Sequence, residues 1–502
     1  CRLTVENPRD TFAIAIIMQR LGTVFRELAM HTTRRQTFRL AAFVGLATAM
    51  TSGVSAAQTA ATGDVTFTRD IVPILQRSCQ HCHRPDSVAP MSLLTFEEAR
   101  PWARAMKSRT ALRNERGAMP PWFIEKNIGI QQFKDDPSLS ESEIEAIATW
   151  ADNGAPRGDP ADLPPPKYVA GDTESWRIGT PDLVLRSREV TVLATGADRW
   201  EPIGIVPTGL TEDRYVEAVE IREVNDIPKD GASNTVGGRF VLHHLNYSSH
   251  VVEDEQPDAF TADTTTVWPV HEVGRNADIF PPNAGRILAA GSVLNLETAH
   301  LHSNGRETKA YLEFAFKLHP VGYKPSVTWV RRFTGNGVDI SIKPTMADQE
   351  LHAYAVLEQH TKILSFEPHM HAPGIRMCLE AIWGAAVQTL TCAGYDHNWV
   401  RSYVYADDAA PLLPEGTILH VIGYMDTTPG NRNVADPRNW GGGGRRSVAN
   451  MFIDLGEGIA LTDEEFEREM GERRDRLGLT KNDVVIGCPL CQVRFPSQET
   501  AP

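Results

Sequence analysis

The spacing of hydrophobic residues predicts helices in the first third of the chain. Apolar positions recur at three- and four-residue intervals over residues 70–78 and 95–112, as on one face of an amphipathic helix. Ser140 and Glu143 have the spacing of a capping box, which predicts the start of a third helix, and Gly154 is placed to end it. We therefore expect a small all-α domain here.

The pattern of hydrophobic and polar residues changes from a helical to a strand-like one after residue 170. Runs rich in Val, Ile, Thr and aromatic residues, such as residues 182–186, 238–242 and 311–318, alternate with Gly, Pro, Asn and Asp. Such runs are typical of antiparallel β-domains. Prolines at positions 160 and 164–166 come before them and predict a stiff linker. The expected fold is multidomain, an all-α part followed by all-β parts.

Composition narrows the class of protein. The chain has 502 residues, of which 41% are hydrophobic and 23% charged, so a disordered or collagen-like chain is excluded. Acidic residues outnumber basic ones by 64 to 50, for a net charge of −14. Because such a surface repels phosphate backbones, nucleic-acid binding is disfavoured. The length is consistent with roughly two to four domains.

Residues 30–57 resemble an export signal. Arg34, Arg35 and Arg39 form a basic stretch, residues 40–50 are apolar, and small residues lead up to Ala57, near which cleavage is expected. The apolar run is too short to span a bilayer, which takes about 20 residues. No later stretch is long and apolar enough, so no stable membrane insertion is predicted. The mature protein is expected in the periplasm or secreted, where cysteine pairs are oxidised or carry haem.

One motif predicts a covalent haem c. Cys79 and Cys82 have the CxxC spacing that lets two thiols add to the vinyl groups of a haem, and His83 follows directly, placed to bind the iron. Met119, between small residues and two prolines, is the better candidate for the sixth ligand, and Met91 is the alternative. His and Met ligation leaves no open position, so this haem is expected to carry electrons.

Three histidine groups lie in the β-rich part: His243 with His244, His300 with His302, and His369 with His371. Residues two apart on a strand share one face, so His369 and His371 can bind one ion. Neighbouring residues point to opposite faces, so His243 and His244 can share an ion only where the strand bends or bulges. Imidazole clusters in an exported chain suit copper or zinc.

The segment from Pro181 to Asp454 resembles the copper type II, ascorbate-dependent monooxygenases, the family of peptidylglycine α-hydroxylating and dopamine β-monooxygenases. It is most similar to bacterial forms with an N-terminal cytochrome c domain. The resemblance implies two jelly-roll-like β-sandwich domains, each with one copper, facing each other across an open, solvent-filled cleft. The expected divisions are an upstream extension with signal peptide (1–57), a cytochrome c domain (58–160), a linker (161–180) and two copper domains (181–322 and 323–502).

The family motifs also imply the copper ligands. His243, His244 and His300 match the electron-transfer copper, with His302 as the alternative to His300. His369 and His371 match the oxygen-binding copper. The thioether ligand of that copper falls on Met451, with Met425 as the poorer match. The Asp-Glu pair that precedes this methionine in the family is absent, and Ala449-Asn450 stand in its place.

The other cysteines are expected to form disulfides. If residues 376–383 and 387–395 form a hairpin about Ala385, equal counting places Cys378 opposite Cys392. Cys488 and Cys491 form a CxxC with no following histidine, so a disulfide is favoured over a second haem.

The resemblance implies that the chain hydroxylates a C–H bond of a small organic substrate with O2. Two electrons are needed for each turnover, and the fused haem suggests that a periplasmic donor supplies them in place of, or besides, ascorbate. The alternative is a non-catalytic haem and copper protein that transfers electrons or holds copper. Hydrolase and dehydrogenase motifs are absent from the sequence.

Overall fold

The computed structural model describes residues 65–85, 87, 89, 91–167, 176–228, 240–252, 265–272, 277–444, 449–480 and 482–491. They belong to one compact unit, Asp64–Pro502. The predicted export signal lies outside the described residues. Strands predominate among these residues, as expected for a β-rich chain, and no helix within them is both long and apolar enough to cross a membrane.

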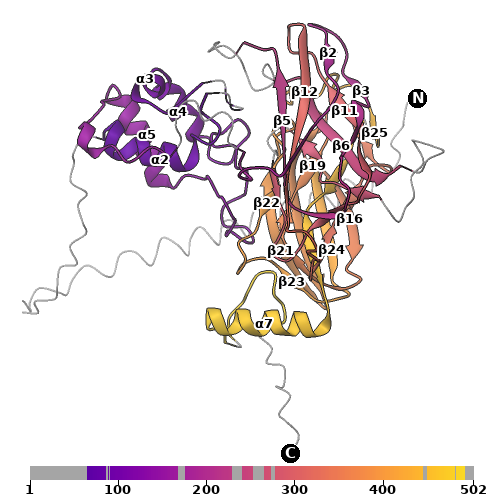
Figure 1. Cartoon of the computed structure of the whole chain (residues 1–502). Coiled ribbons are helices and arrows are strands. Elements are labelled where there is room, and N and C mark those ends of the chain that lie inside the picture. The colour runs from indigo at the N-terminus through magenta and orange to yellow at the C-terminus, as the bar shows by residue number, and fades with distance from the viewer. Residues whose placement is uncertain are drawn as a thin grey trace, which may run out of the picture. The chain divides into compact units, whose positions relative to one another are not determined.

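Helices gather in two places along the chain, before the first strand and after the last one (Figure 1). The helical elements are η1 (Phe67–Ile71), α2 (Val72–Ser78), α3 (Phe96–Ala99), η2 (Arg100–Trp102), α4 (Ala103–Thr110), α5 (Glu141–Asp152), η3 (Pro160–Asp162) and α7 (Asp463–Leu477).

The three predicted helices are present. The capping box of Ser140 and Glu143 opens α5, and Gly154 has a positive φ just after the helix ends. The stretch 95–112 forms α3, η2 and α4 in succession, with Pro101 at the start of η2. Phe67, Ile147 and Trp150 are buried together, so these helices share one hydrophobic cluster.

The first part of the β-rich region contains two antiparallel six-stranded sheets. One consists of β1 (Leu183–Arg186), β12 (Thr308–Leu318), β5 (Arg214–Asn225) and β10 (Arg286–Leu288), with β2 (Val190–Val192) and β9 (Ala277–Ile279) at its sides. The other consists of β3 (Arg199–Glu201), β11 (Ser292–Leu301), β6 (Leu242–Val251) and β7 (Thr266–Val267), with β4 (Gly204–Pro207) and β8 (His271–Glu272). We call this part the first β region.

Both sheets of the first β region contribute to one hydrophobic cluster. Ile221 and Phe314 come from the first sheet, and Leu245 and Leu294 from the second. The predicted strands 182–186 and 311–318 correspond to β1 and β12. The predicted strand 238–242 begins outside the described residues, and β6 starts at Leu242.

The second β region follows from residue 328. Its largest sheet has the order β16 (Gln349–Val356), β24 (Ile418–Met425), β20 (Gly374–Trp383) and β21 (Ala386–Gly394). A second sheet contains β13 (Thr328–Arg331), β27 (Glu457–Leu461), β17 (His360–Ile363) and β23 (Leu412–Leu413). Smaller sheets are β14 (Thr334–Asn336) with β26 (Phe452–Asp454) and β19 (Pro368–Met370), β15 (Ser341–Ile342) with β25 (Gly441–Gly442), and β18 (Ser365–Phe366) with β22 (Tyr403–Val404).

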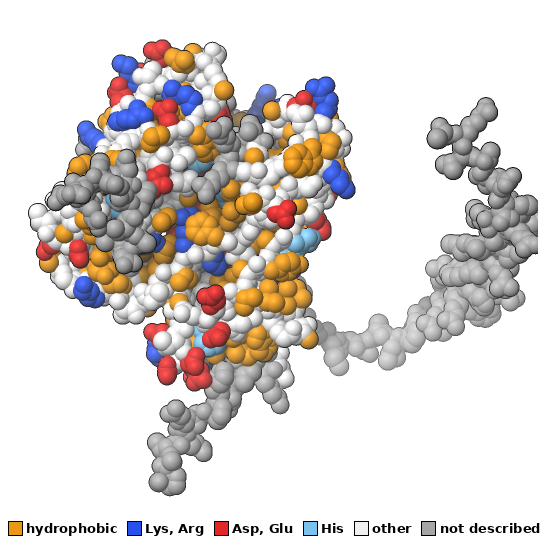
Figure 2. Space-filling view, turned by 90° about the vertical axis from the view of Figure 1, so that its right-hand side faces the viewer, with side chains coloured by type: hydrophobic (Ala, Val, Ile, Leu, Met, Phe, Trp, Pro, Cys, Tyr) orange, Lys and Arg blue, Asp and Glu red, His pale blue; other side chains and the backbone are white. Residues whose placement is uncertain are grey.

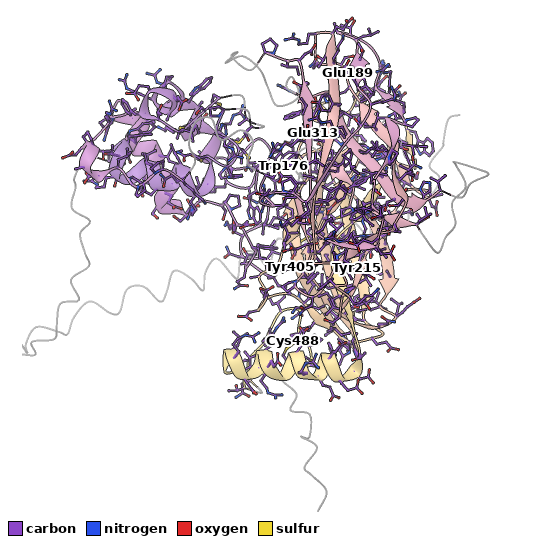
Figure 3. All side chains as sticks on the ribbon, in the orientation of Figure 1. Trp176, Glu189, Tyr215, Glu313, Tyr405 and Cys488 are labelled. Atoms are coloured by element: carbon purple, nitrogen blue, oxygen red, sulfur yellow. A yellow bond between two sulfur atoms is a disulfide. The ribbon has the colours of Figure 1, made fainter. Side chains whose placement is uncertain are left out.

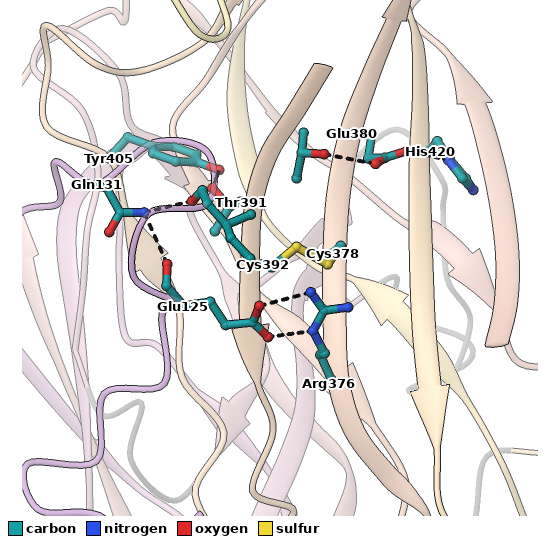
Figure 4. The surroundings of a disulfide bond; sticks show 11 residues. Glu125, Gln131, Arg376, Cys378, Glu380, Thr391, Cys392, Tyr405 and His420 are labelled. Atoms are coloured by element: carbon teal, nitrogen blue, oxygen red, sulfur yellow. Dashed lines mark hydrogen bonds and ion pairs between the residues drawn. A yellow bond between two sulfur atoms is a disulfide. The ribbon is translucent and has the colours of Figure 1, made fainter. Parts of the chain in front are cut away.

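Part of the segment between α4 and α5 packs on this second β region. Trp122 and Phe133 are buried in its hydrophobic cluster, where Trp122 meets Tyr403 edge to face. Glu125 forms an ion pair with Arg376 of β20 (Figure 4). Hydrophobic side chains also reach the surface of the chain (Figure 2).

Both predicted disulfides are present. Cys378 lies opposite Cys392 on β20 and β21, and the two are bonded (Figure 4). Cys488 is bonded to Cys491 and packs beside α7, where Phe466 is also buried (Figure 3). The second bond closes a short turn in the segment that follows α7, and burial of both cysteines in the cluster with Phe466 packs that segment beside the helix.

Candidate metal centre

A β-bulge brings His243 and His244 together on β6. His300 of β11 pairs with His244, whereas its neighbour Leu301 pairs with Leu242, so His243 is the extra residue of the bulge. The Nδ1 atoms of His243 and His244 are consequently 3.4 Å apart. This is the departure from a regular strand that the adjacent histidines require to share an ion.

The start of β6 is held in place by a carboxylate. Glu223 of β5 accepts hydrogen bonds from the backbone N–H groups of Val241 and Leu242, at 3.1 and 2.9 Å. These contacts fix the backbone immediately before His243. The position of the bulge therefore depends on the neighbouring sheet as well as on β6 itself.

His300 completes a three-histidine group. One ring nitrogen from each of His243, His244 and His300 lies within 4.8 Å of the others. Nε2 of His300 is 2.7 Å from the Asp198 carboxylate, and the Trp200 ring stacks on the imidazole at 4.3 Å. These contacts orient the ring and leave Nδ1 of His300 buried with no hydrogen-bond partner. A nitrogen oriented in this way suits a metal ligand.

His302, the alternative ligand, is not a member of that group. Its ring centroid lies 6.0 Å from that of His243 and 6.4 Å from that of His300. The geometry therefore favours His300.

The second pair of histidines is oriented in the same way. His369 and His371 lie at the end of β19, with ring centroids 5.7 Å apart. Nδ1 of His369 is 2.7 Å from Oε1 of Glu272, and Nδ1 of His371 is 3.0 Å from the carbonyl oxygen of Ala449. If each Nδ1–H donates to these oxygens, each Nε2 keeps its lone pair for a metal.

Met451 lies beside His371, because the backbones of these two residues are joined by a hydrogen bond. The His371 N–H donates to the Met451 carbonyl at 3.2 Å. The Met451 side chain packs on Gly337, where a Cβ added to the glycine would lie 3.7 Å from the sulfur atom. Met425, the poorer candidate, is fully buried in the hydrophobic cluster of the second β region.

The two histidine groups contact each other. The rings of His244 and His369 have centroids 6.4 Å apart, and His397 of the second β region stacks on His243 at 5.4 Å. Glu272 pairs with His244 across the β6–β8 ladder and reaches His369 with its side chain. The resemblance implies an open cleft between the two centres, whereas here they form one continuous cluster.

Burial keeps the imidazoles of His243, His244 and His371 neutral. It lowers the pKa of His243 and His244 well below the usual value, and neighbouring histidines lower it further. Burial also lowers the pKa of His371 to about 3. Neutral imidazole is the form that binds copper or zinc.

Sequence reasoning did not identify Asp198, Glu272 and His397. Each comes from a loop or a two-residue strand with no neighbouring ligand motif, and its role depends on contacts with residues far along the chain. The dipeptide His271-Glu272 matches no sequence motif that would mark it as part of a metal site.

The CxxCH motif follows α2. Cys79 and Cys82 are not in a disulfide, and His83 is 8% exposed. Nδ1 of His83 is 3.2 Å from the carbonyl oxygen of Met91. If that nitrogen donates, Nε2 is the atom free to bind iron, and the backbone of Met91 lies on the opposite edge of the ring from the metal. This arrangement disfavours Met91 as the sixth ligand and leaves Met119, which is 38% exposed, as the remaining candidate.

A positive side chain of the second β region lies close to this motif. Burial raises the pKa of the Cys82 thiol to about 11, and the charge of Arg401 opposes that rise. The Arg401 guanidinium covers the Trp122 ring at 4.8 Å, and its Nε is buried with no hydrogen-bond partner. A buried guanidinium with an unpartnered Nε suits the propionate carboxylates of a haem.

No protein-family model and no curated protein matches the sequence. Among solved structures, a candidate alpha-L-fucosidase from Bacteroides ovatus is 9% identical, with a TM-score of 0.15, and the alignment covers 59% of this chain and 41% of that one. The infectious bursal disease virus VP2 subviral particle is 8% identical over 57% of this chain and 72% of that one, with a TM-score of 0.18. Similarities this weak carry no argument about function.

Proposed function

We propose that this chain is an exported monooxygenase of the copper type II, ascorbate-dependent class, with an N-terminal cytochrome c domain and two jelly-roll-like copper domains. It would hydroxylate a C–H bond of a small organic substrate with O2. The observation that carries the proposal is the three-histidine group of His243, His244 and His300, with the pair His369 and His371 from the other β region beside it.

The donor atoms in this cluster fit two copper ions. His243, His244 and His300 supply imidazole nitrogens to one site, and His369 and His371 supply two more to the other. Imidazole is a favoured ligand of copper. The buried, unpaired Nδ1 of His300 has no other evident use.

Copper bound at these sites would supply one-electron transfer and the reduction of O2. The chain supplies orientation and exclusion of water. Asp198 and Glu272 fix the rings of His300 and His369 through the nitrogens that face away from the metal. Burial of His300 and His371, each 3% exposed, keeps solvent from the ligand atoms.

Cys79, Cys82, His83 and Met119 would hold a haem c, which would supply electron transfer. A periplasmic donor or ascorbate would reduce it. Arg401, with its unpaired buried Nε, would hold a propionate of this haem. The two disulfides agree with an oxidising compartment, as expected for an exported chain.

A non-catalytic haem and copper protein is the second candidate. It is favoured by the position of Met451, whose side chain packs on Gly337, and by the missing Asp-Glu pair before it. Without a thioether the reduced copper would be less well stabilised.

The test begins with metal and haem analysis of the exported protein, which is expected to contain one haem and two coppers per chain. Reduced haem in the copper-loaded protein should then be reoxidised by O2 in the presence of substrate, with O2 consumed in proportion to product. The variant His369→Ala should lose one copper and all hydroxylation while keeping the haem spectrum. Reversible redox changes with no O2 consumption would support the second candidate.

A further inference from the structure

A second histidine cluster lies on the outer face of the sheet β16–β24–β20–β21. Tyr354, His420, Glu380 and Thr389 are successive cross-strand partners on this face. His352 lies two residues before Tyr354 on β16 and so shares its face, diagonal to His420. Figure 4 labels Glu380 and His420 on adjoining strands.

The two imidazoles point a nitrogen at each other. Nδ1 of His352 is 3.0 Å from Nε2 of His420. The opposite nitrogen of each ring faces a carboxylate: Nδ1 of His420 lies 2.9 Å from Glu380, and Nε2 of His352 lies 3.7 Å from Glu350. The row therefore runs from carboxylate to imidazole to imidazole to carboxylate.

Further contacts fix the side chains of Glu380 and His420. The Thr389 hydroxyl donates to the other oxygen of Glu380 at 3.0 Å. The Tyr354 ring stacks on His420 at 4.3 Å with an interplanar angle of 6°. His420 is 8% exposed, so its ring is held by packing as well as by the carboxylate.

This geometry is that of a metal ligand pair. Glu380 accepts a hydrogen bond from Nδ1–H of His420, which leaves the lone pair of His420 on Nε2, facing Nδ1 of His352. In the tautomer protonated at Nε2, His352 offers a second lone pair from that Nδ1. Imidazole nitrogens bind zinc or copper at about 2.0–2.1 Å, so two such ligands at about a right angle are about 3 Å apart. The measured separation of 3.0 Å matches that spacing.

We propose that His352 and His420 form a surface site for a divalent transition metal ion, with copper(II) bound in preference to zinc. The preference follows the general order of affinities for nitrogen ligands. Water completes the coordination, since the side chain of His352 is 43% exposed. The site uses none of the histidines of the candidate metal centre, so it does not depend on the proposed function.

The test is titration of the metal-free full chain with copper(II), followed by calorimetry and by electron paramagnetic resonance. A His243→Ala/His369→Ala background weakens the other cluster and isolates this site. In that background His352→Ala and His420→Ala should each remove one equivalent of copper, together with the signature of two coordinating imidazole nitrogens. His319→Ala is the matched control, because His319 contacts Ala284 and Tyr323 in the first β region and should leave the equivalent in place.

Glu380→Gln keeps both ligands and should lower the copper affinity about 10- to 100-fold. His352 is the more exposed ligand, so His352→Ala should keep the melting temperature of the metal-free protein and exclude misfolding as the cause. The proposal is overturned if His352→Ala binds as much copper as its background, or if the pair only shares a proton and no copper signal with two imidazoles appears. Loss of copper from the other cluster alone would affect the proposed function and leave this site intact.

Discussion

Oε1 of Glu272 lies 2.7 Å from Nδ1 of His369, although the two residues are 97 positions apart in the chain. Glu272 belongs to β8 of the first β region and His369 to β19 of the second. The other carboxylate oxygen, Oε2, is buried with no hydrogen-bond partner. One residue from the first β region thus sets the orientation of a predicted ligand in the second.

Replacing Glu272 by Leu is expected to weaken copper binding at His369 and His371 by about 10- to 100-fold, because loss of the carboxylate frees the ring to rotate and to change tautomer. Glu272→Gln retains a carbonyl acceptor and should have a smaller effect. The measurement is competition for copper against a chelator of known affinity.

Glu313→Gln is the control for this series. Glu313 is paired with Arg186 at 2.8 Å on a different sheet, and Figure 3 labels it on β12. It should leave both coppers unchanged. Equal copper affinity in the wild type and Glu272→Leu would contradict the positioning role.

Two further variants decide between His300 and His302. His300→Ala should remove one copper, because it deletes the buried Nδ1 that joins the three-histidine group. His302→Ala should retain both, since its ring lies 6.0 Å from that of His243. Copper content by elemental analysis gives the answer, and the opposite pattern would transfer the assignment to His302.

The sixth haem ligand can be tested by potentiometry. A thioether ligand raises the haem reduction potential, so Met119→Ala should lower it. Met91→Ala should leave it unchanged, because His83 contacts the backbone carbonyl of Met91 and not its side chain. A fall in potential with Met91→Ala alone would reverse the assignment.

Local patterns in the sequence were sufficient for the elements and for pairs close in the chain. The capping box at Ser140 predicted α5, and counting along the hairpin placed Cys378 opposite Cys392. Two deviations from the predicted hairpin cancel each other. Next to the turn, the strand pairs are centred between Gly384 and Ala385 and not on Ala385. A register shift between Leu379 and Glu380 then moves the centre to Ala385, so that Cys378 still lies opposite Cys392.

Contacts between residues far apart in the chain could not be predicted from local sequence patterns. The need for a bulge at His243 could be stated from the two-residue period of a strand, but its position is set by pairing with His300, 57 residues later. Asp198, Glu272 and His397 carry no periodic or motif signal. The helix α7 was missed although Thr462 and Glu465 form a capping box at its start.

The two disulfides should differ in their contribution to stability. Cross-linking Cys378 and Cys392, 14 residues apart, restricts the unfolded chain more than linking Cys488 and Cys491, which are 3 apart. Removing the first pair with Cys378→Ala/Cys392→Ala should cost about 3 kcal/mol, and removing the second about 2 kcal/mol. Urea denaturation measures both. A larger loss from the second pair would show that the packing beside α7 outweighs chain entropy.

The stability of the metal-free protein is expected to fall as the pH decreases from 7 to 5. Burial lowers the pKa of His371 to about 3 in the folded chain, whereas an unfolded histidine titrates near 6.5. Below about pH 6.5 this histidine binds a proton in the unfolded chain but not in the folded chain, so the free energy of unfolding decreases. At pH 5 this histidine alone accounts for a loss of about 2 kcal/mol, and His243 and His244 act in the same direction. His371→Gln should therefore flatten the dependence by about that amount when urea denaturation is compared at pH 7 and pH 5, and an unchanged slope would show that His371 is protonated in the folded protein.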